Sequence, residues 1–315
     1  MSFSIGWSAV VPGHSHHLLE VDPDRGHLYV SDGWGVAYAS LSLRILNIAD
    51  GAELAKVRTR HQQARAITFV GGDALVATDS RLFQLTRANL VEQRAWDSRV
   101  PRYADTLVHE NGKLFMANWL RPTAAIFDLD AGRTSRLTLE PGVRAVLRGR
   151  ELLVYALGSG VLRSLDVGTR SQRVLIKGET GRSVAMVADR WLAVLKAGWK
   201  TDSSGVQLPA PTSREIALYD LEDGTVRAFP LSRETVAIEG AANSPLLWLL
   251  QRGTGPRELP SIVEQVELPS FRSVQTVVAP VGSDVAQVIP NQSLAVFVVP
   301  NYRESRATLS LARVS

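Results

Sequence analysis

Histidines are concentrated near the N-terminus of this 315-residue chain, in two short polar segments. Four of the six histidines lie there: His14, His16, His17 and His61. Histidine is the usual general acid or base near neutral pH. We therefore predict His16 and His61 as catalytic residues with Asp105 as their carboxylate partner, and His14 and His17 as ligand-binding residues.

The same histidines allow two other interpretations. Two of them with Asp105 would form a candidate site for a divalent ion, although the sequence H-S-H-H at 14–17 matches no recognised metal-ligand spacing. They would otherwise be surface or hydrogen-bonding residues. No metal ligand and no cofactor is predicted, and a divalent ion is the alternative left open.

Arginines occur in the same kind of segment along the chain. The predicted ligand-binding residues of this group are Arg65, Arg102, Tyr103, Arg144 and Arg182. Clustered guanidinium groups would focus positive potential and favour an anionic or carboxylate-bearing ligand. The alternative is that these arginines form ion pairs between neighbouring structural units.

Composition restricts the class of protein. The chain has 45% hydrophobic and 21% charged residues, which is typical of a folded globular protein. It contains no cysteine, which excludes disulfides, thiolate nucleophiles and cysteine-ligated metals. The net charge of +4 is spread along the chain, so no nucleic-acid partner is predicted. The absence of cysteine fits a cytoplasmic location. No apolar run approaches the roughly 20 residues of a spanning helix, so we expect no membrane partner.

A hairpin pattern repeats along the sequence. Alternating apolar strands end in Asp or Asn and a glycine-containing turn, which is typical of tight β-hairpins. Upstream of these hairpins are seven nearly continuous apolar runs, as expected for strands buried on both faces. The runs are HLYVSD (27–32), ALVATD (74–79), KLFMAN (113–118), ELLVYAL (151–157), WLAVLKA (191–197), PLLWLLQ (245–251) and SLAVFVV (293–299).

Units of about 40–50 residues with four short strands each are the period of propeller blades. The sequence therefore predicts an all-β fold: residues 1–315 as one seven-bladed β-propeller domain of four-stranded antiparallel blades. The last unit, from Asp284, supplies only three strands. We expect SFSIGWSAVV at 2–11 to supply its fourth strand, joining the N-terminus to the C-terminal blade and closing the ring.

Two of the apolar runs carry a family resemblance. LYVSD (28–32) and LFMAN (114–118) resemble the YVTN-type repeat of bacterial seven-bladed β-propellers. The resemblance implies the fold. Relatives of this shape include surface-layer proteins, subunits of quinoprotein amine dehydrogenases and a lyase, so the resemblance implies no single activity.

In an up-and-down blade of four strands, the loop between the second and third strands and the crossing to the next blade lie on the same face of the propeller. These loops are long, and long loops tend to carry function. They bring five predicted ligand-binding aromatics to that side: Trp34, Tyr38, Trp119, Trp199 and Tyr302. The alternative is that they pack the loops onto the blades.

We therefore predict a binding protein for a small anionic ligand or a protein partner. The alternatives are an enzyme (lyase, hydrolase or cyclase) with a histidine base and arginines that stabilise negative charge, and a propeller subunit of an oxidoreductase complex.

Overall fold

The computed structural model describes residues 4–97, 101–118, 123–140, 142–149, 151–203, 206–253, 260–280, 282–290 and 293–313. These residues form strands and turns, with one short 3-10 helix, η1 (Tyr38–Ser40). They group into two compact units. The first contains 1–118, 124–137 and 294–315, and the second contains 119–123 and 138–293. Within the described ranges, no helix is long and apolar enough to cross a membrane.

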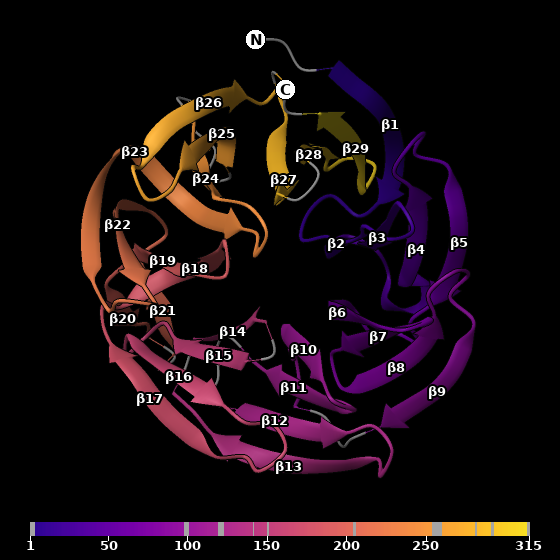
Figure 1. The fold of residues 1–315 in the computed structure, drawn as a ribbon. Coiled ribbons are helices and arrows are strands. Elements are labelled where there is room, and N and C mark those ends of the chain that lie inside the picture. The colour runs from indigo at the N-terminus through magenta and orange to yellow at the C-terminus, as the bar shows by residue number, and fades with distance from the viewer. Residues whose placement is uncertain are drawn as a thin grey trace. The chain divides into compact units, whose positions relative to one another are not determined.

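Three four-stranded sheets of the first unit are each built from strands consecutive in the chain (Figure 1). The first sheet contains β2 (Leu19–Asp22), β3 (His27–Ser31), β4 (Ser42–Asn47) and β5 (Glu53–Arg58). The second contains β6 (Ala64–Val70), β7 (Asp73–Thr78), β8 (Arg81–Thr86) and β9 (Glu92–Asp97). The third contains β10 (Thr106–Glu110), β11 (Lys113–Ala117), β12 (Thr123–Asp128) and β13 (Arg133–Thr138). The predicted four-stranded units are confirmed here.

The two ends of the chain meet in the first unit (Figure 1). β1 (Ser4–Pro12) pairs antiparallel with β29 (Arg306–Arg313), and β29 pairs with β28 (Leu294–Asn301). The indole of Trp7 on β1 donates a hydrogen bond to the carbonyl oxygen of Ile48 at 2.6 Å, which ties β1 to the turn after β4. The predicted pairing of the N-terminal strand with the final strands is therefore confirmed.

The second unit repeats the hairpin pattern with one departure. β14 (Val143–Arg148), β15 (Glu151–Ala156), β16 (Val161–Leu165) and β17 (Gln172–Lys177) form a four-stranded sheet. A seven-stranded sheet follows, in the order β18 (Gly181–Val187), β19 (Trp191–Lys196), β22 (Ser213–Asp220), β23 (Val226–Gly240), β24 (Leu246–Arg252), β25 (Pro260–Glu267) and β26 (Arg272–Val278). The remaining strands are β20 (Trp199–Thr201) and β21 (Gln207–Pro209), which pair with each other, and β27 (Asp284–Ile289).

The seven-stranded sheet corrects one expectation. The sequence predicts a separate crossing between two blades at the polar segment SRETV (232–236), but this segment lies inside the continuous strand β23. The first half of β23 pairs with β22 and the second half pairs with β24, so one strand serves both predicted blades.

The core lies between the faces of neighbouring sheets. On β7, Leu75 and Ala77 share a buried cluster with Leu114 of the third sheet. The alternate residues Ala74 and Val76 share a cluster with residues of the first sheet. Side chains of a strand alternate between the two faces of its sheet, so β7 is buried on both. This confirms the interpretation of the continuous apolar runs.

A buried ion pair joins the first and second sheets. The guanidinium of Arg87 donates to both carboxylate oxygens of Asp22, at 2.6 Å from Nε and 2.5 Å from Nη2. The hydroxyl of Tyr29 donates to the Arg87 carbonyl at 2.6 Å. Asp22 is fully buried, so this contact replaces its hydration completely.

Candidate functional site

The crossing before β2 lies against the loop between β3 and β4 in the first unit. The backbone of Trp34 donates to the Ser15 carbonyl at 2.7 Å and accepts from the His14 amide at 2.8 Å. Gly33 permits this approach, because a Cβ there would overlap the Ser15 carbonyl oxygen. The crossing and the long loop therefore share one side of this unit, as predicted.

Four aromatic rings gather at this junction, and we call His14, His16, Trp34 and Tyr302 the aromatic patch. The rings of His16 and Trp34 lie with centroids 4.0 Å apart and planes inclined by 36°. The rings of His14 and Tyr302 lie 4.9 Å apart and are inclined by 44°. The patch joins the crossing, the loop after β3 and the turn between β28 and β29, and so brings together four of the residues predicted to form the site.

The surroundings of His16 and His17 favour the neutral form of their imidazole rings. Burial lowers the pKa of His16, and the nearby positive charges of His14 and Arg65 lower it further. Burial also lowers the pKa of His17, while its hydrogen bond to the Pro12 carbonyl at 3.0 Å opposes the shift. Near pH 7, His16 and His17 are therefore neutral and add hydrogen-bonding capacity rather than positive charge.

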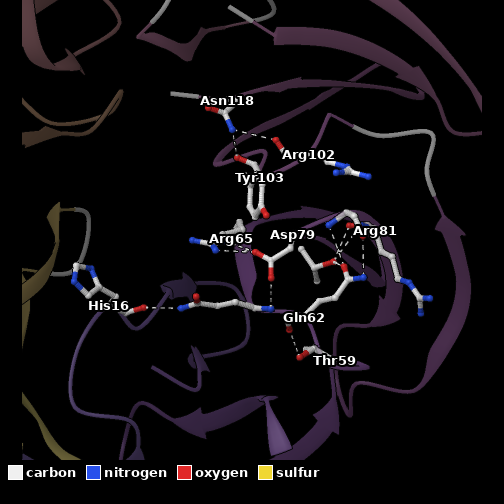
Figure 2. A network of polar contacts seen from close by, with 12 residues as sticks. His16, Thr59, Gln62, Arg65, Asp79, Arg81, Arg102, Tyr103 and Asn118 are labelled. Atoms are coloured by element: carbon white, nitrogen blue, oxygen red, sulfur yellow. Dashed lines mark hydrogen bonds and ion pairs between the residues drawn. The ribbon is translucent and has the colours of Figure 1, made fainter. Parts of the chain in front are cut away.

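Asp79 organises the next part of this side (Figure 2). Its carboxylate accepts from the Arg65 guanidinium at 2.7 Å and from the Gln63 amide at 3.1 Å. The side chain of Gln63 in turn donates to the His16 carbonyl at 3.1 Å. These contacts connect the predicted residue Arg65 to the aromatic patch.

The same network continues to Tyr103 (Figure 2). The Arg65 guanidinium carbon lies 5.4 Å from the centroid of the Tyr103 ring, a cation–π distance. The Tyr103 amide donates to the Asp79 carbonyl at 2.9 Å. The side-chain amide of Asn118 donates to the carbonyls of Tyr103 and Arg102, at 2.9 and 3.0 Å. Arg102 itself points its exposed side chain away from these bonds.

Gln62 holds the crossing that carries His61. Its side-chain oxygen accepts from the Thr78 hydroxyl at 2.6 Å and from the Ser80 amide at 3.0 Å. Its side-chain nitrogen donates to the Ser80 hydroxyl at 2.9 Å, and its carbonyl accepts from the hydroxyl of Thr59. The crossing is thereby fixed to the end of β7.

Left-handed backbone recurs at predicted site residues in the crossings before β2, β6 and β10. The φ angles are 57° at His16, 65° at His61 and 57° at Tyr103. Side chains other than glycine adopt this conformation at a cost of about 1–2 kcal/mol, so the surrounding hydrogen bonds must impose it. Each crossing thus makes a sharp, fixed turn before its inner strand.

The predicted catalytic set is spread along this side. His16 stacks on Trp34, and His61 is exposed in its turn. Asp105 accepts a long hydrogen bond from the Thr106 hydroxyl at 3.5 Å. None of these contacts joins two members of the set, so a catalytic role for them stays a prediction.

The second unit holds three further predicted residues. The indole nitrogen of Trp199 donates to the Gly181 carbonyl at 2.7 Å, and its ring packs on Gly142. Trp199 therefore anchors the β20–β21 hairpin. Arg144 lies near Glu239, a residue with exposed surface. Desolvation by the surrounding protein atoms raises the pKa of Glu239 to about 7, and the positive charge of Arg144 opposes this rise. Arg182 lies at the start of β18, and Trp119 lies outside the described residues.

Three residues of the site were missed by sequence reasoning: Gln63, Asp79 and Asn118. A signal for two of them was present. Asp79 and Asn118 close the apolar runs ALVATD and KLFMAN, and Asp32 closes HLYVSD at the equivalent place. Asp32 accepts from the Ser42 amide at 2.9 Å and pairs with Arg44. A polar residue closing the second strand thus fixes the adjoining loop or crossing in all three sheets.

The residues that the structure describes contain no group of three or more histidine, aspartate or glutamate side chains that could hold a metal ion.

Comparison with known proteins identifies the architecture. No protein-family model matches the sequence, and no curated protein sequence matches it. The solved WD40 domain of Neurospora crassa Pan2 is similar, with a TM-score of 0.67 over 99% of this chain and 96% of that domain. The fold is a β-propeller. At 9% sequence identity this likeness shows the fold of the β-propeller alone, and membership of the YVTN-type family stays a prediction.

Proposed function

We propose that this β-propeller has seven blades and is a binding protein, which holds a protein partner over the aromatic patch of its first unit. The distribution of exposed aromatic side chains carries this proposal. Among the described Trp, Tyr and Phe residues, those that stay largely exposed are Trp34 (55%), Tyr38 (70%), Tyr103 (42%) and Tyr302 (66%). All four belong to crossings and loops of the first unit.

The blade count is supported by the strand pairing within each unit. The first unit contributes three complete four-stranded sheets and the group β28-β29-β1. The second contributes β14–β17 and a seven-stranded sheet in which β23 belongs to two blades. An experimental structure with six or eight blades would contradict this part of the proposal.

Exposed aromatics suit a protein interface when they are held in place beforehand. Hot-spot residues of interfaces are enriched in tryptophan, tyrosine and arginine. Here the backbone of Trp34 is fixed by two hydrogen bonds to the crossing, and its ring is supported by His16. The side chain therefore loses little freedom on binding, which favours affinity.

The local charges indicate what the partner brings. The Arg65 charge is already balanced by Asp79, and His16 is neutral near pH 7. The centre of the patch is consequently aromatic rather than ionic. We expect the partner to insert an apolar or aromatic anchor between Trp34 and Tyr302.

The proposal is tested by site-specific photo-crosslinking in cells, followed by affinity measurement with the captured protein in purified form. A crosslinker at Trp34 is expected to capture a partner that one at Val10, an exposed residue on β1 of the same unit, does not. Trp34→Ala with Tyr302→Ala should weaken binding of the purified partner by about 30-fold or more. Val10→Ala is the matched control. Equal binding by both variants would refute the role of the patch.

A further inference from the structure

Arg65 and Arg182 occupy the same unusual backbone position in their respective units. Each is the extra residue of a β-bulge at the start of an inner strand. In β6, Ala64 pairs with Thr78 and Ala66 with Ala77, which leaves Arg65 without a partner residue. In β18, Gly181 and Ser183 pair with consecutive residues of β19 in the same way. Bulges redirect the side chain of the extra residue and occur often beside functional sites.

The two arginines differ in what balances their charge. In the first unit, Asp79 directly follows Thr78 and pairs with Arg65 at 2.7 Å. The equivalent place in the second unit, directly after the cross-strand partner of Gly181, is occupied by Ala197. The carboxylate that neutralises the first guanidinium thus has no counterpart beside the second.

The described contacts of Arg182 leave donors of its guanidinium unused. Nη1 donates to the Ala210 carbonyl at 2.7 Å, while Nε is buried without a hydrogen-bond partner. No carboxylate among the described residues forms an ion pair with Arg182. A buried donor left unsatisfied is costly, by about 1–3 kcal/mol, so the structure keeps Arg182 there against its own stability.

A second arginine adds positive charge at the same place. Arg252, at the end of β24, is close enough for its charge to lower the pKa of Arg182, after the larger effect of burial. The inner strands meet here, since the Ser183 hydroxyl contacts the Ile238 amide at 3.3 Å. Glu234 balances Arg252 through a contact of 3.2 Å with Nη1. Two guanidinium groups therefore lie close enough in the second unit for their charges to interact.

We propose that Arg182, supported by Arg252, binds the oxyanion of a small ligand, a phosphate or carboxylate group, in the second unit. The edge formed by Nε and Nη2 is the one through which arginine binds oxyanions in two parallel hydrogen bonds. An anion there would accept a hydrogen bond from the buried Nε and offset the positive charge of Arg182. Arg65 lacks this capacity because Asp79 already occupies the equivalent position. The site is independent of the protein-binding patch.

The test is isothermal titration of the purified full-length chain with inorganic phosphate and, separately, with acetate, at constant ionic strength set by chloride. Saturable binding of at least one anion is expected, and the stronger one identifies the group that the site prefers. Arg182→Gln should weaken that binding by about tenfold or more, and Arg182→Lys should leave it intermediate because the charge stays but the fork is lost. Arg214→Gln is the matched control, because Arg214 is an exposed residue at a register shift of a strand in the same unit.

Thermal unfolding provides a second readout. Phosphate or acetate, whichever binds, should raise the melting temperature of the wild type and of Arg214→Gln but not that of Arg182→Gln. Circular dichroism confirms that each variant is folded. Absence of saturable binding to the wild type, or equal binding by Arg182→Gln and Arg214→Gln, would overturn the proposal. Loss of partner binding after changes at Trp34 would leave this result unaffected.

Discussion

The imidazole of His16 lies against the indole of Trp34, with ring centroids 4.0 Å apart, although the two residues belong to different loops. This contact couples the aromatic patch to pH. Partial burial lowers the pKa of His16, and the nearby charges of His14 and Arg65 lower it further, so the imidazole in this contact is neutral near pH 7.

The sign of the resulting pH dependence follows from linkage. A histidine whose pKa in the folded protein lies below its ordinary value of 6.5 contributes stability that is present above pH 6.5 and is lost as the pH falls toward the folded-state pKa. We expect the melting temperature of the wild type to fall more between pH 7 and pH 5 than that of His16→Asn. Asparagine tolerates the left-handed backbone at this position. Identical shifts in the two proteins would contradict the prediction.

Gly33 provides a test of the close approach between crossing and loop. In Gly33→Ala the new Cβ would collide with the Ser15 carbonyl oxygen and the His17 ring, so the backbone would have to move. We expect a loss of about 2 kcal/mol or more in the free energy of unfolding, measured by urea denaturation. Gly72→Ala is the matched control, since its Cβ would meet nothing within 4 Å. A change in Gly33→Ala no larger than in this control would count against the described packing.

The ion pair of Asp22 and Arg87 is expected to be among the most sensitive polar contacts of the first unit. Asp22→Asn removes the buried carboxylate that pairs with the nearly buried Arg87 guanidinium and leaves it the exposed carboxylate of Asp24 at 2.9 Å. Breaking a buried pair of this kind costs about 3–5 kcal/mol. Glu267→Gln, which breaks an exposed pair with Arg272, should change stability little. Chemical denaturation of both variants distinguishes the cases. Similar losses would show that burial of the first pair is not what makes it important.

Much of the fold could be predicted from the sequence, because burial on both faces leaves a visible pattern. The apolar runs at 74–79 and 113–118 became β7 and β11, and the leftover N-terminal strand pairs with β29 as expected. The continuity of β23 was missed, because polar residues at 232–236 look like a loop. They remain extended because β22 and β24 both pair with this strand.

The site was harder to predict, because its residues acquire their roles from partners distant in sequence. Trp34, Tyr302 and His14 could be assigned to one side from chain direction alone. The role of Asp79 depends on the arrival of Arg65 and Gln63 from the preceding crossing, and their bonds come from the folded geometry. For the same reason the anchoring role of Trp199 could not be predicted, because it depends on the hydrogen bond from its indole to the Gly181 carbonyl.

The contrast between Asp79 and Ala197 leads to a final prediction about the oxyanion site. Ala197→Asp would place a carboxylate where the first unit has one, next to the bulge that carries Arg182. We expect this carboxylate to pair with Arg182 as Asp79 pairs with Arg65, and so to compete with phosphate or acetate for the guanidinium.

The measurement is the same titration, with circular dichroism to establish that Ala197→Asp is folded. Anion binding should fall by about tenfold or more relative to the wild type, as in Arg182→Gln. Ala197→Asn is the matched control, because it has nearly the same shape without the charge and should retain more binding. If folded Ala197→Asp binds anions as the wild type does, the absent carboxylate is not what leaves Arg182 available. Equal loss in Ala197→Asp and Ala197→Asn would instead assign the effect to altered packing around a residue that is 9% exposed.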